Sequence, residues 1–398
     1  LSSVKGAIAL ISSNGEALLD ITNSISSNLD FLKNHNGTGS SITLNSGISD
    51  NKISIDMSNS DQTSFDLKKY DYGTDILSIL LDDLNVRDGN GTALTAKEIT
   101  HIWINNADQL NAIQQYSEDN QNSKILSYNF ALKNNIDASV LDEGTYKPIG
   151  GDEGYKGTFD GRDYRIIGLS VGKDNANDTL NSAGIFSTIG DGGVVKNLRV
   201  YGSEFYGLDY AGAIAGKNEG SISGIITLGN HIEVFGSKDS STDIDGKITG
   251  LAGGIAGYNA GTIKNISASD SVVAGANNNV DTYTTAGGIV GLNAEDGKIG
   301  GENDEDHVIA DSAVTSNGST STTLSLGGIA GVNQGQMDLI TSTGVVNAEY
   351  GGSITSGNVG GVVGINSGDI VSAFNSSDVT GGNNTGGIAG YNLDTISN

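Results

Sequence analysis

Short runs of alternating apolar and polar residues fill most of this chain, and Gly, Asn or Ser separates one run from the next. Asp369–Asn375 and Lys52–Met57 are two such runs. Alternation with a period of two predicts β-strands with one buried face, and the small polar residues between them predict turns. The single Pro among 398 residues fits this pattern, because Pro cannot donate to a strand ladder. We therefore expect an all-β chain.

A seven-residue motif, Gly-Gly-Ile-Ala-Gly-x-Asn, organises these runs. Each copy has a glycine at its first or second position and closes on an asparagine. These pairs are Gly212 and Asn218, Gly254 and Asn259, Gly288 and Asn293, Gly328 and Asn333, Gly361 and Asn366, and Gly387 and Asn392. The closing asparagines are separated by 41, 34, 40, 33 and 26 positions. Self-similarity at such periods predicts a solenoid, in which each repeat stacks on the previous one.

The shortest repeat, from Asn366 to Asn392, indicates the unit of the solenoid. It contains three short strands separated by turn residues, which predicts one coil of a three-sided, right-handed parallel β-helix. The longer repeats keep the strands and lengthen a loop, as in Gly236–Lys247 and Gly300–Thr323. Insertions of this kind cost a solenoid little stability.

Each residue type in the motif has a structural reason. The Ile fills the interior, while the Gly residues let backbones of neighbouring coils approach closely. Asn suits a left-handed turn position. Repeated once per coil, the closing Asn side chains would form a ladder of amide hydrogen bonds. We therefore expect the repeated Gly and Asn residues to be architecture and not a ligand site.

The first third of the chain differs from the repeats. Residues 1–70 alternate in short strands and predict a β-solenoid shaft segment. Residues 71–125 predict a junction with two short helices, 74–84 and 107–116, the second capped by Asn106. Residues 126–398 then form the repeat β-helix, and we expect the sequence to be truncated at its C-terminal end.

The net charge of −26 and the pI of about 4.2 exclude several partners. Such a surface repels phosphates, so we expect no nucleic acid, and no apolar run is long enough for membrane insertion. The chain has no Cys and thus no disulfides or thiolate metal sites. Acidic loops are either solvated or bind calcium, the only cofactor that the sequence suggests. The candidate calcium ligands are Asp239, Asp243, Asp245, Asp304 and Asp306.

Catalytic motifs are missing from the sequence. No HExxH occurs, and His35, His101, His231 and His307 lie far apart. Arg162, Asp163 and Arg165 lie beside Asp160, a combination that a polysaccharide-cleaving β-helix could use. Paired carboxylates are too common in an acidic chain to carry that interpretation. We therefore expect that the chain is not an enzyme.

The motif resembles the GLUG repeat of large bacterial adhesins, which also occurs beside the protease domains of immunoglobulin-A peptidases. The resemblance extends upstream to Ile104–Ile113 and to Phe159-Asp160-Gly161. The rhythm of residues 1–70 is similar to filamentous-haemagglutinin-like exoproteins secreted by the two-partner route. These resemblances imply a secreted protein of the bacterial cell surface, a role in virulence, and an outer-membrane secretion partner.

The leading hypothesis is a non-catalytic, rigid β-helical shaft that presents loops for cell adhesion, with a host-cell or matrix receptor or a glycan as partner. The inserted loops are the candidate contact regions. Phe205, Tyr206, Tyr210 and Tyr283 are candidate stacking residues, with packing as their alternative role. The alternative functions are a polysaccharide-cleaving enzyme and a passive stalk whose binding domain lies elsewhere.

Overall fold

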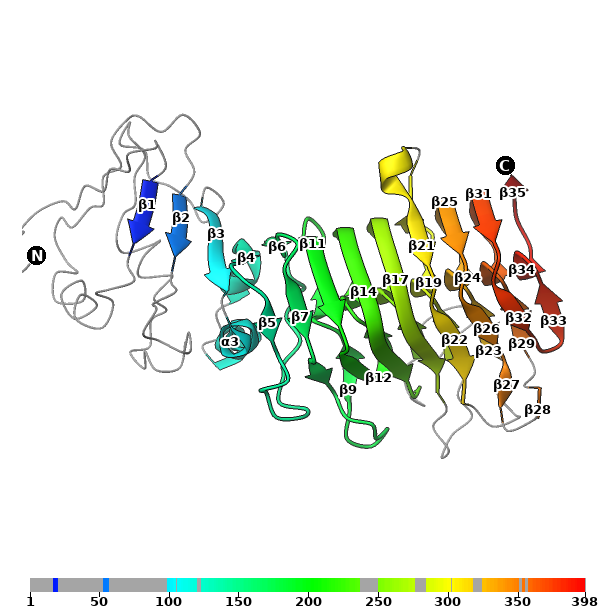
Figure 1. Ribbon diagram of the computed structural model, residues 1–398, viewed down its shortest axis with the longest axis horizontal. Coiled ribbons are helices and arrows are strands. Elements are labelled where there is room, and N and C mark those ends of the chain that lie inside the picture. The colour runs from blue at the N-terminus through cyan, green and yellow to red at the C-terminus, as the bar shows by residue number, and fades with distance from the viewer. Residues whose placement is uncertain are drawn as a thin grey trace, which may run out of the picture. The chain divides into compact units, whose positions relative to one another are not determined.

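The computed structural model describes residues 17–20, 53–56, 99–104, 106–119, 123–236, 250–275, 284–301, 303–317, 324–350, 353–354 and 357–397. These residues form an all-β structure with a single α-helix (Figure 1). The chain divides into two compact units: unit 1 comprises residues 1–135 and 157–160, and unit 2 comprises residues 136–156 and 161–398. Within the described ranges, no helix has the length and apolar character needed to cross a membrane.

Unit 1 is a short parallel ladder with one helix. Its elements are β1 (Ala17–Asp20), β2 (Ile53–Asp56), β3 (Ile99–Ile104), α3 (Ala107–Asp119), the 3-10 helix η3 (Ser123–Ser127), β4 (Phe130–Leu132) and β6 (Thr158–Asp160). The strands pair in parallel in the order β1, β2, β3, β4, β6.

Helix α3 confirms the helix predicted over 107–116 and extends it by one turn. The backbone N–H of Gln109 donates to Oδ1 of Asn106 at 2.9 Å, so the predicted cap forms. Two of the strands predicted before residue 70 coincide with β1 and β2. The remaining ones, and the helix predicted over 74–84, lie outside the described residues.

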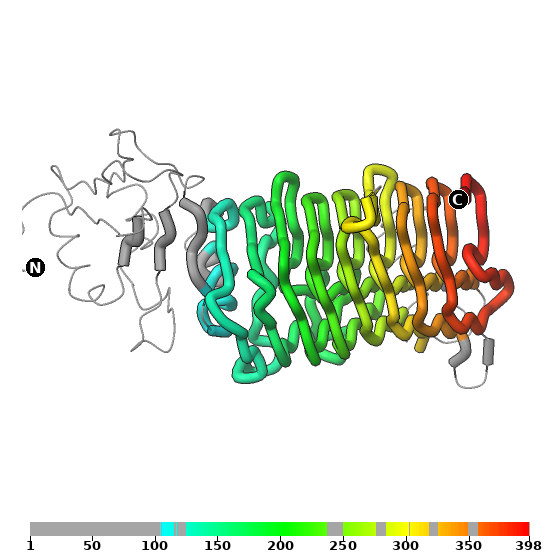
Figure 2. Tube along the Cα trace, turned by 45° about the horizontal axis from the view of Figure 1, so that its top comes forward, coloured from blue at the N-terminus to red at the C-terminus, as the bar shows by residue number. Residues whose placement is uncertain are grey.

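Unit 2 consists of four rows of parallel strands, and each repeat adds one strand to every row (Figures 1 and 2). The first row contains β5 (Ile136–Asp137), β7 (Arg165–Ile167), β11 (Val194–Tyr201), the first part of β14 (Ser221–Val234), the first part of β17 (Thr262–Ala274), β20 (Lys298–Ile299) with β21 (Val308–Ala310), β25 (Gln336–Ser342), β31 (Asp369–Asn375) and β35 (Ile396–Ser397). The second row contains β8 (Ser170–Val171), the start of β12 (Glu204–Gly212), the ends of β14 and β17, β22 (Ala313–Ser316), β26 (Val345–Asn347) and β32 (Asp378–Thr380).

The third and fourth rows carry the motif. The third contains β9 (Leu180–Ala183), the end of β12, β15 (Gly250–Gly253), β18 (Thr284–Gly287), β23 (Leu324–Gly327), β29 (Gly357–Gly360) and β33 (Asn384–Gly386). The fourth contains β10 (Phe186–Ile189), β13 (Ala215–Asn218), β16 (Ala256–Asn259), β19 (Val290–Asn293), β24 (Ala330–Asn333), β30 (Val363–Asn366) and β34 (Ala389–Asn392). Outside the rows lie the short 3-10 helix η4 (Asp304–Asp306) and the antiparallel pair β27 (Glu349–Tyr350) and β28 (Ser353–Ile354).

The number of strands per repeat corrects the sequence prediction. The shortest repeat, Asn366 to Asn392, holds four strands (β31, β32, β33 and β34) where three were expected. The sequence pattern predicts one strand for the motif, but the motif spans two rows because the chain turns at its second Gly and Ile. In the repeat that ends at Asn293, Gly287 closes β18 and Val290 opens β19.

The core of unit 2 is a set of aliphatic columns. The Ile at the motif's turn is fully buried in successive repeats, as at Ile255, Ile289 and Ile329. A second column from the first row includes Ile222, Ile263 and Ile299, each at most 1% exposed. Since like side chains stack directly above one another along parallel ladders, a repeat that preserves these positions preserves the fold.

The closing asparagines form the amide ladder that the sequence predicts. Each Nδ2 donates to Oδ1 of the next copy at 2.7–2.8 Å, through Asn218, Asn259, Asn293, Asn333, Asn366 and Asn392. The first five side chains are completely buried. Burial of an amide is tolerated here because both its donor and its acceptor are used.

A left-handed kink recurs in the first row. Asn197, Gly224, Asn265, Leu339 and Ser372 all have positive φ and occupy equivalent positions in their repeats, and in the repeat between Asn265 and Leu339 the positive φ falls one position earlier, at Gly300. Asn and Gly tolerate this conformation, whereas Leu339, with φ of 48°, is strained. The kink lets each long strand of the first row bend without losing its pairing.

Candidate functional site

Apart from β12, which runs through both rows, the strands of the second row end and those of the third row begin at one edge of the unit, which we call the loop-bearing edge. The connecting segments are 172–179, 235–249, 275–283, 317–323, 348–356 and 381–383. The strands on either side keep their register across repeats, as Val234 with Ala274 and Gly250 with Thr284 show. Insertions of different length therefore begin and end at stacked positions. The predicted loop 236–247 starts at this edge, and its residues after Gly236 lie outside the described ones.

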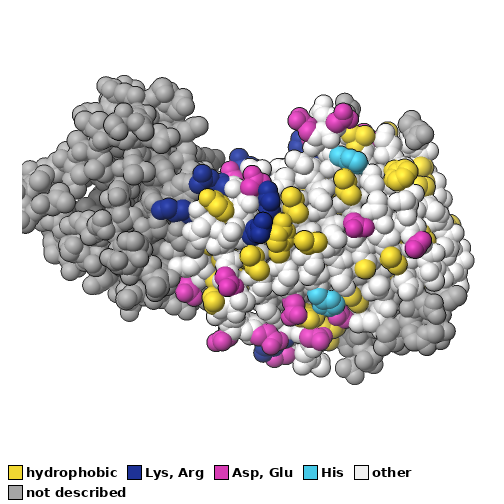
Figure 3. Space-filling model, in the orientation of Figure 1, with side chains coloured by type: hydrophobic (Ala, Val, Ile, Leu, Met, Phe, Trp, Pro, Cys, Tyr) yellow, Lys and Arg dark blue, Asp and Glu magenta, His cyan; other side chains and the backbone are white. Residues whose placement is uncertain are grey.

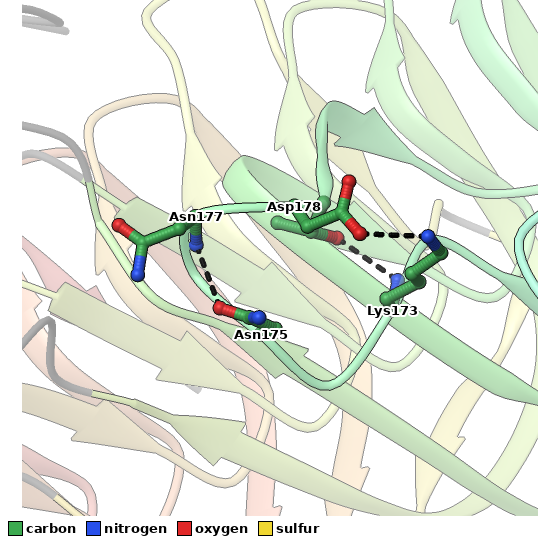
Figure 4. Close-up of polar contacts among 5 residues, drawn as sticks. Lys173, Asn175, Asn177 and Asp178 are labelled. Carbon is green, nitrogen blue, oxygen red and sulfur yellow. Dashed lines mark hydrogen bonds and ion pairs between the residues drawn. The ribbon is translucent and has the colours of Figure 1, made fainter.

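Segment 172–179 shows how one such loop is held (Figure 4). Lys173 Nζ forms an ion pair with Asp178 Oδ2 at 2.7 Å, and the backbone N–H of Asn177 donates to Oδ1 of Asn175 at 3.0 Å. At the base, Thr179 Oγ1 donates to the carbonyl of Tyr206 at 2.6 Å. The polar side chains of this loop thus satisfy one another and fix the loop on β12.

A cluster of aromatic and acidic side chains lies beneath this loop. On β12 and β14, Glu204 is the register partner of His231, and Tyr206 is the partner of Glu233. The Tyr206 ring packs against the rings of His231 and Phe235, with centroids 5.5 and 6.4 Å apart. In Figure 3, a His with Asp and Glu side chains around it marks the region where Figure 1 places β12.

His231 and Glu233 are an interacting titratable pair. His231 Nε2 lies 3.2 Å from Glu233 Oε2, and this hydrogen bond raises the pKa of the imidazole. Glu204 and Asp174 add to the increase by their charge. Burial raises the pKa of Tyr206 to about 12, with a further contribution from Glu204. The cluster therefore concentrates negative charge around a half-buried imidazole, which suits hydroxyl groups or cations as ligands.

Glu233 also links three successive repeats. Its Oε1 accepts a hydrogen bond from Nδ2 of Asn317, and Gly275 of the intervening repeat lies below this contact. A Cβ on Gly275 would lie 2.9 Å from Glu233 Oε1 and 2.4 Å from the Val234 carbonyl oxygen. The absence of a side chain at Gly275 thus allows the carboxylate to reach Asn317.

The structure places only two of the predicted calcium ligands, and it does not bring them together as a site. Asp306 Oδ1 is 2.9 Å from Lys264 Nζ, and this hydrogen bond lowers the pKa of Asp306. Asp304 is exposed on η4. Asp239, Asp243 and Asp245 lie outside the described residues. Within the described ranges, no three His, Asp or Glu side chains are close enough to hold a metal ion.

Three of the predicted stacking residues serve as packing. Phe205, Tyr206 and Tyr210 are 0%, 8% and 7% exposed, and Tyr283 lies outside the described residues. Arg162, Asp163 and Arg165 lie at the start of the first row, and Asp163 Oδ1 is 3.6 Å from Arg199 Nη2. Arg165 lies on β7, and Arg162 and Asp163 lie in the turn that precedes it, so none of the three belongs to the loop-bearing edge.

A buried polar network at the corner between the first and second rows was not predicted. Asp270 Oδ1 accepts from the backbone N–H and Nδ2 of Asn230 at 3.0 and 2.8 Å, and Oδ2 accepts from Thr227 Oγ1. Burial raises the pKa of Asp270 to about 6, although these donors favour the charged form. The signal in the sequence is weak: a polar residue recurs at this corner as Ser203, Asn230, Asp270 and Ser312.

No protein-family model matches the sequence. Among curated proteins, the chain is similar to halomucin of Haloquadratum walsbyi, with 32% identity over 108 residues that make up 25% of this chain and 1% of halomucin. The chain thus spans only a very small part of that relative.

Among solved structures, two that are similar to the chain are immunoglobulin A1 protease-like proteins. One is a Bacteroides ovatus protein provisionally assigned as an immunoglobulin A1 protease, with 18% identity, a TM-score of 0.42, and coverage of 72% of this chain and 84% of that one. The other is an IgA1 protease with 18% identity, a TM-score of 0.48, and coverage of 74% of this chain and 21% of that one.

These names overturn the expectation from the sequence that the chain is not an enzyme, since both structures carry the name of a protease. Neither structure identifies a peptidase site in this chain, because structural similarity at 18% identity assigns no activity to particular residues.

Proposed function

We propose that the chain is a segment of a secreted bacterial surface protein that attaches to a host-cell or matrix receptor or to a glycan through its loop-bearing edge. The observation that carries this proposal is that the described strand ends flanking the connections between the second and third rows stack at one edge. Rigid rows with variable loops at one edge are a common arrangement for binding surfaces.

The proposal includes a right-handed parallel β-helix as the architecture of unit 2. The parallel register of the motif copies supports it, as does the return of the chain to each row once per repeat. Crossovers between parallel strands of one sheet are right-handed in about 98% of cases, which gives the proposed hand. The GLUG-like and haemagglutinin-like resemblances add an adhesin role and export through an outer-membrane partner.

The attachment proposal is tested by binding to a glycan array and to cultured cells. The exposed carboxylates next to His231 are replaced in the double variant D174N/E204Q. The matched control D191N/E219Q removes two exposed carboxylates from turns elsewhere. We expect the first variant to lose at least tenfold in binding while the control stays within twofold of wild type. Equal binding by wild type and D174N/E204Q, or no binding by wild type, would overturn the proposal.

Calcium binding by the acidic loops is tested on the same protein. Titration with calcium after chelation should raise the Tm if the loops bind the ion, because binding to the native state alone stabilises it. A Tm that stays constant up to millimolar calcium would reject calcium binding by these loops.

A second candidate is polysaccharide cleavage at the same edge, and the His231–Glu233 pair favours it. A histidine whose pKa is raised by a carboxylate can act as a general acid near neutral pH. Depolymerisation of acidic and neutral polysaccharides that is lost in H231N would support this candidate, while the absence of product with the wild-type protein would reject it.

A further inference from the structure

The outward face of the first row carries arginines at neighbouring positions. Arg165 on β7 and Arg199 on β11 are register partners, and so are Ile167 and Tyr201. Leu228 on β14 is in turn the register partner of Tyr201. Neighbouring strands lie about 4.8 Å apart, so Arg165 and Arg199 project from adjacent strands on the same side of the sheet. We call Arg165, Ile167, Arg199, Tyr201 and Leu228 the arginine face.

The arginine face is held in place by its own contacts. The guanidinium carbon of Arg165 lies 5.3 Å from the centre of the Tyr201 ring, which is the geometry of a cation–π contact. Arg199 Nη2 lies 3.6 Å from Oδ1 of Asp163, whose side chain is 73% exposed. Because the ring orients Arg165 before a ligand arrives, less side-chain entropy is lost when an anion binds.

Apolar side chains adjoin the two cations. Ile167 is 38% exposed and Leu228 is 51% exposed, although both belong to regular strands. In Figure 3, Lys and Arg side chains lie next to hydrophobic ones in the region where Figure 1 places β11. A ligand for this surface therefore needs both negative charge and apolar faces.

The surrounding charge limits the ligand further. The chain carries a net charge of −26, and three of its four arginines, Arg162, Arg165 and Arg199, fall within this region. The net negative charge repels any polyanion at long range, so attraction must come from these arginines at short range, where salt screens the more distant carboxylates. The surrounding charge thus limits binding to anions that contact Arg165 and Arg199 directly.

We propose that the arginine face binds a polysaccharide of uronate sugars. Carboxylates accept paired hydrogen bonds from the planar guanidinium fork, and the apolar C–H faces of sugar rings pack on Ile167 and Leu228. Successive carboxylates of such a chain recur at a spacing of the same order as the strands. The surface is separate from the loop-bearing edge, so this proposal stands or fails independently of the attachment proposed there.

The test measures binding of the full chain to polygalacturonate, with dextran, dextran sulfate and polyglutamate as comparison polymers. The variant R165Q/R199Q removes both guanidinium groups. The matched control K217Q/K298Q removes two cations elsewhere, one of which, Lys217, also lies over a tyrosine ring at 4.3 Å. A third variant, R165K/R199K, keeps the charge and removes the fork. Circular dichroism and Tm show that each variant is folded.

We expect wild type to bind polygalacturonate and not dextran, R165Q/R199Q to bind at least tenfold more weakly, R165K/R199K to be intermediate, and K217Q/K298Q to stay within twofold of wild type. No binding of polygalacturonate, or equal binding by wild type and R165Q/R199Q, would overturn the proposal. Tighter binding of dextran sulfate would replace the carboxylate by a sulfate ligand, and equal binding of polyglutamate would replace the sugar by an acidic peptide. Loss of polygalacturonate binding in D174N/E204Q would assign it to the loop-bearing edge instead.

Discussion

The side-chain amide of Asn259 donates to Oδ1 of Asn293 at 2.8 Å, and both side chains are completely excluded from solvent. Asn293 in turn donates to Asn333, so each amide in this part of the ladder is donor and acceptor at once. The contact joins consecutive repeats that are 34 residues apart in sequence. Removal of one amide therefore affects the repeats on both sides of it.

Replacement of Asn293 by Ala should destabilise the protein by about 2–4 kcal/mol, because it leaves a buried donor on Asn259 and a buried acceptor on Asn333 unpaired. Asn392, at the exposed end of the ladder, provides the control, and N392A should cost well under half as much. Urea unfolding measures both. Equal losses would show that the ladder contributes no more in the interior than at its end.

Asp270 should make stability depend on pH. Burial raises its pKa from 3.8 to about 6, so the folded protein holds the proton of Asp270 more tightly than the unfolded chain does. Protonated Asp270 therefore contributes to the free energy of unfolding. This contribution is complete below the pKa of the unfolded state and is lost as the pH rises through about 6. At pH 7.5, D270N should therefore be more stable than wild type, by about 3 kcal/mol at most. At pH 4 this difference should largely disappear. Unfolding by urea at both pH values provides the measurement, and a difference that does not change with pH would contradict it.

A comparison of two glycines with positive φ distinguishes backbone strain from steric clash as causes of destabilisation. A Cβ on Gly300, with φ of +77°, would lie 1.7 Å from the carbonyl oxygen of Asp338, whereas Gly202, with φ of +55°, has nothing within 4 Å. G202A should cost about 1 kcal/mol, which is the conformational penalty alone. G300A should cost several times more, because the backbone of the next repeat must move. Similar melting temperatures for the two variants would argue against a tightly constrained kink.

The pKa of His231 should fall when its partner is neutralised. Glu233 supplies the hydrogen bond that raises this pKa, whereas Glu204 acts only through its charge. Titration of the imidazole by NMR should therefore give a lower pKa in E233Q than in wild type, with a smaller decrease in E204Q. A larger effect in E204Q would show that His231 is oriented toward the other carboxylate.

The repeated features were predictable because they depend on one residue type at a recurring place. The amide ladder follows from the recurrence of Asn after each Gly-Gly-Ile-Ala-Gly, and the core column follows from the Ile. The division of the motif between two rows was not predicted, because its amino-acid sequence does not distinguish a turn at Gly-Gly from a continuous strand.

Contacts between side chains of different repeats were less accessible to prediction. Thr227 and Asn230 both bond to Asp270, which is 43 and 40 residues away from them, and the register also shifts between Leu228 and His231. The pairing of Arg165 with Arg199 likewise depends on strand register. Loops of unequal length hide these alignments in the sequence, even though the strands that carry them are easily recognised.

The loop-bearing edge has a consequence for how such a protein can diversify. A connection between the second and third rows can lengthen, shorten or change composition while the strands on either side keep their partners, as Ala274 with Ser316 and Gly253 with Gly287 do. Loop length costs free energy only logarithmically, so a gene can acquire insertions at this edge with little loss of stability. Recognition can therefore evolve separately from folding, one repeat at a time.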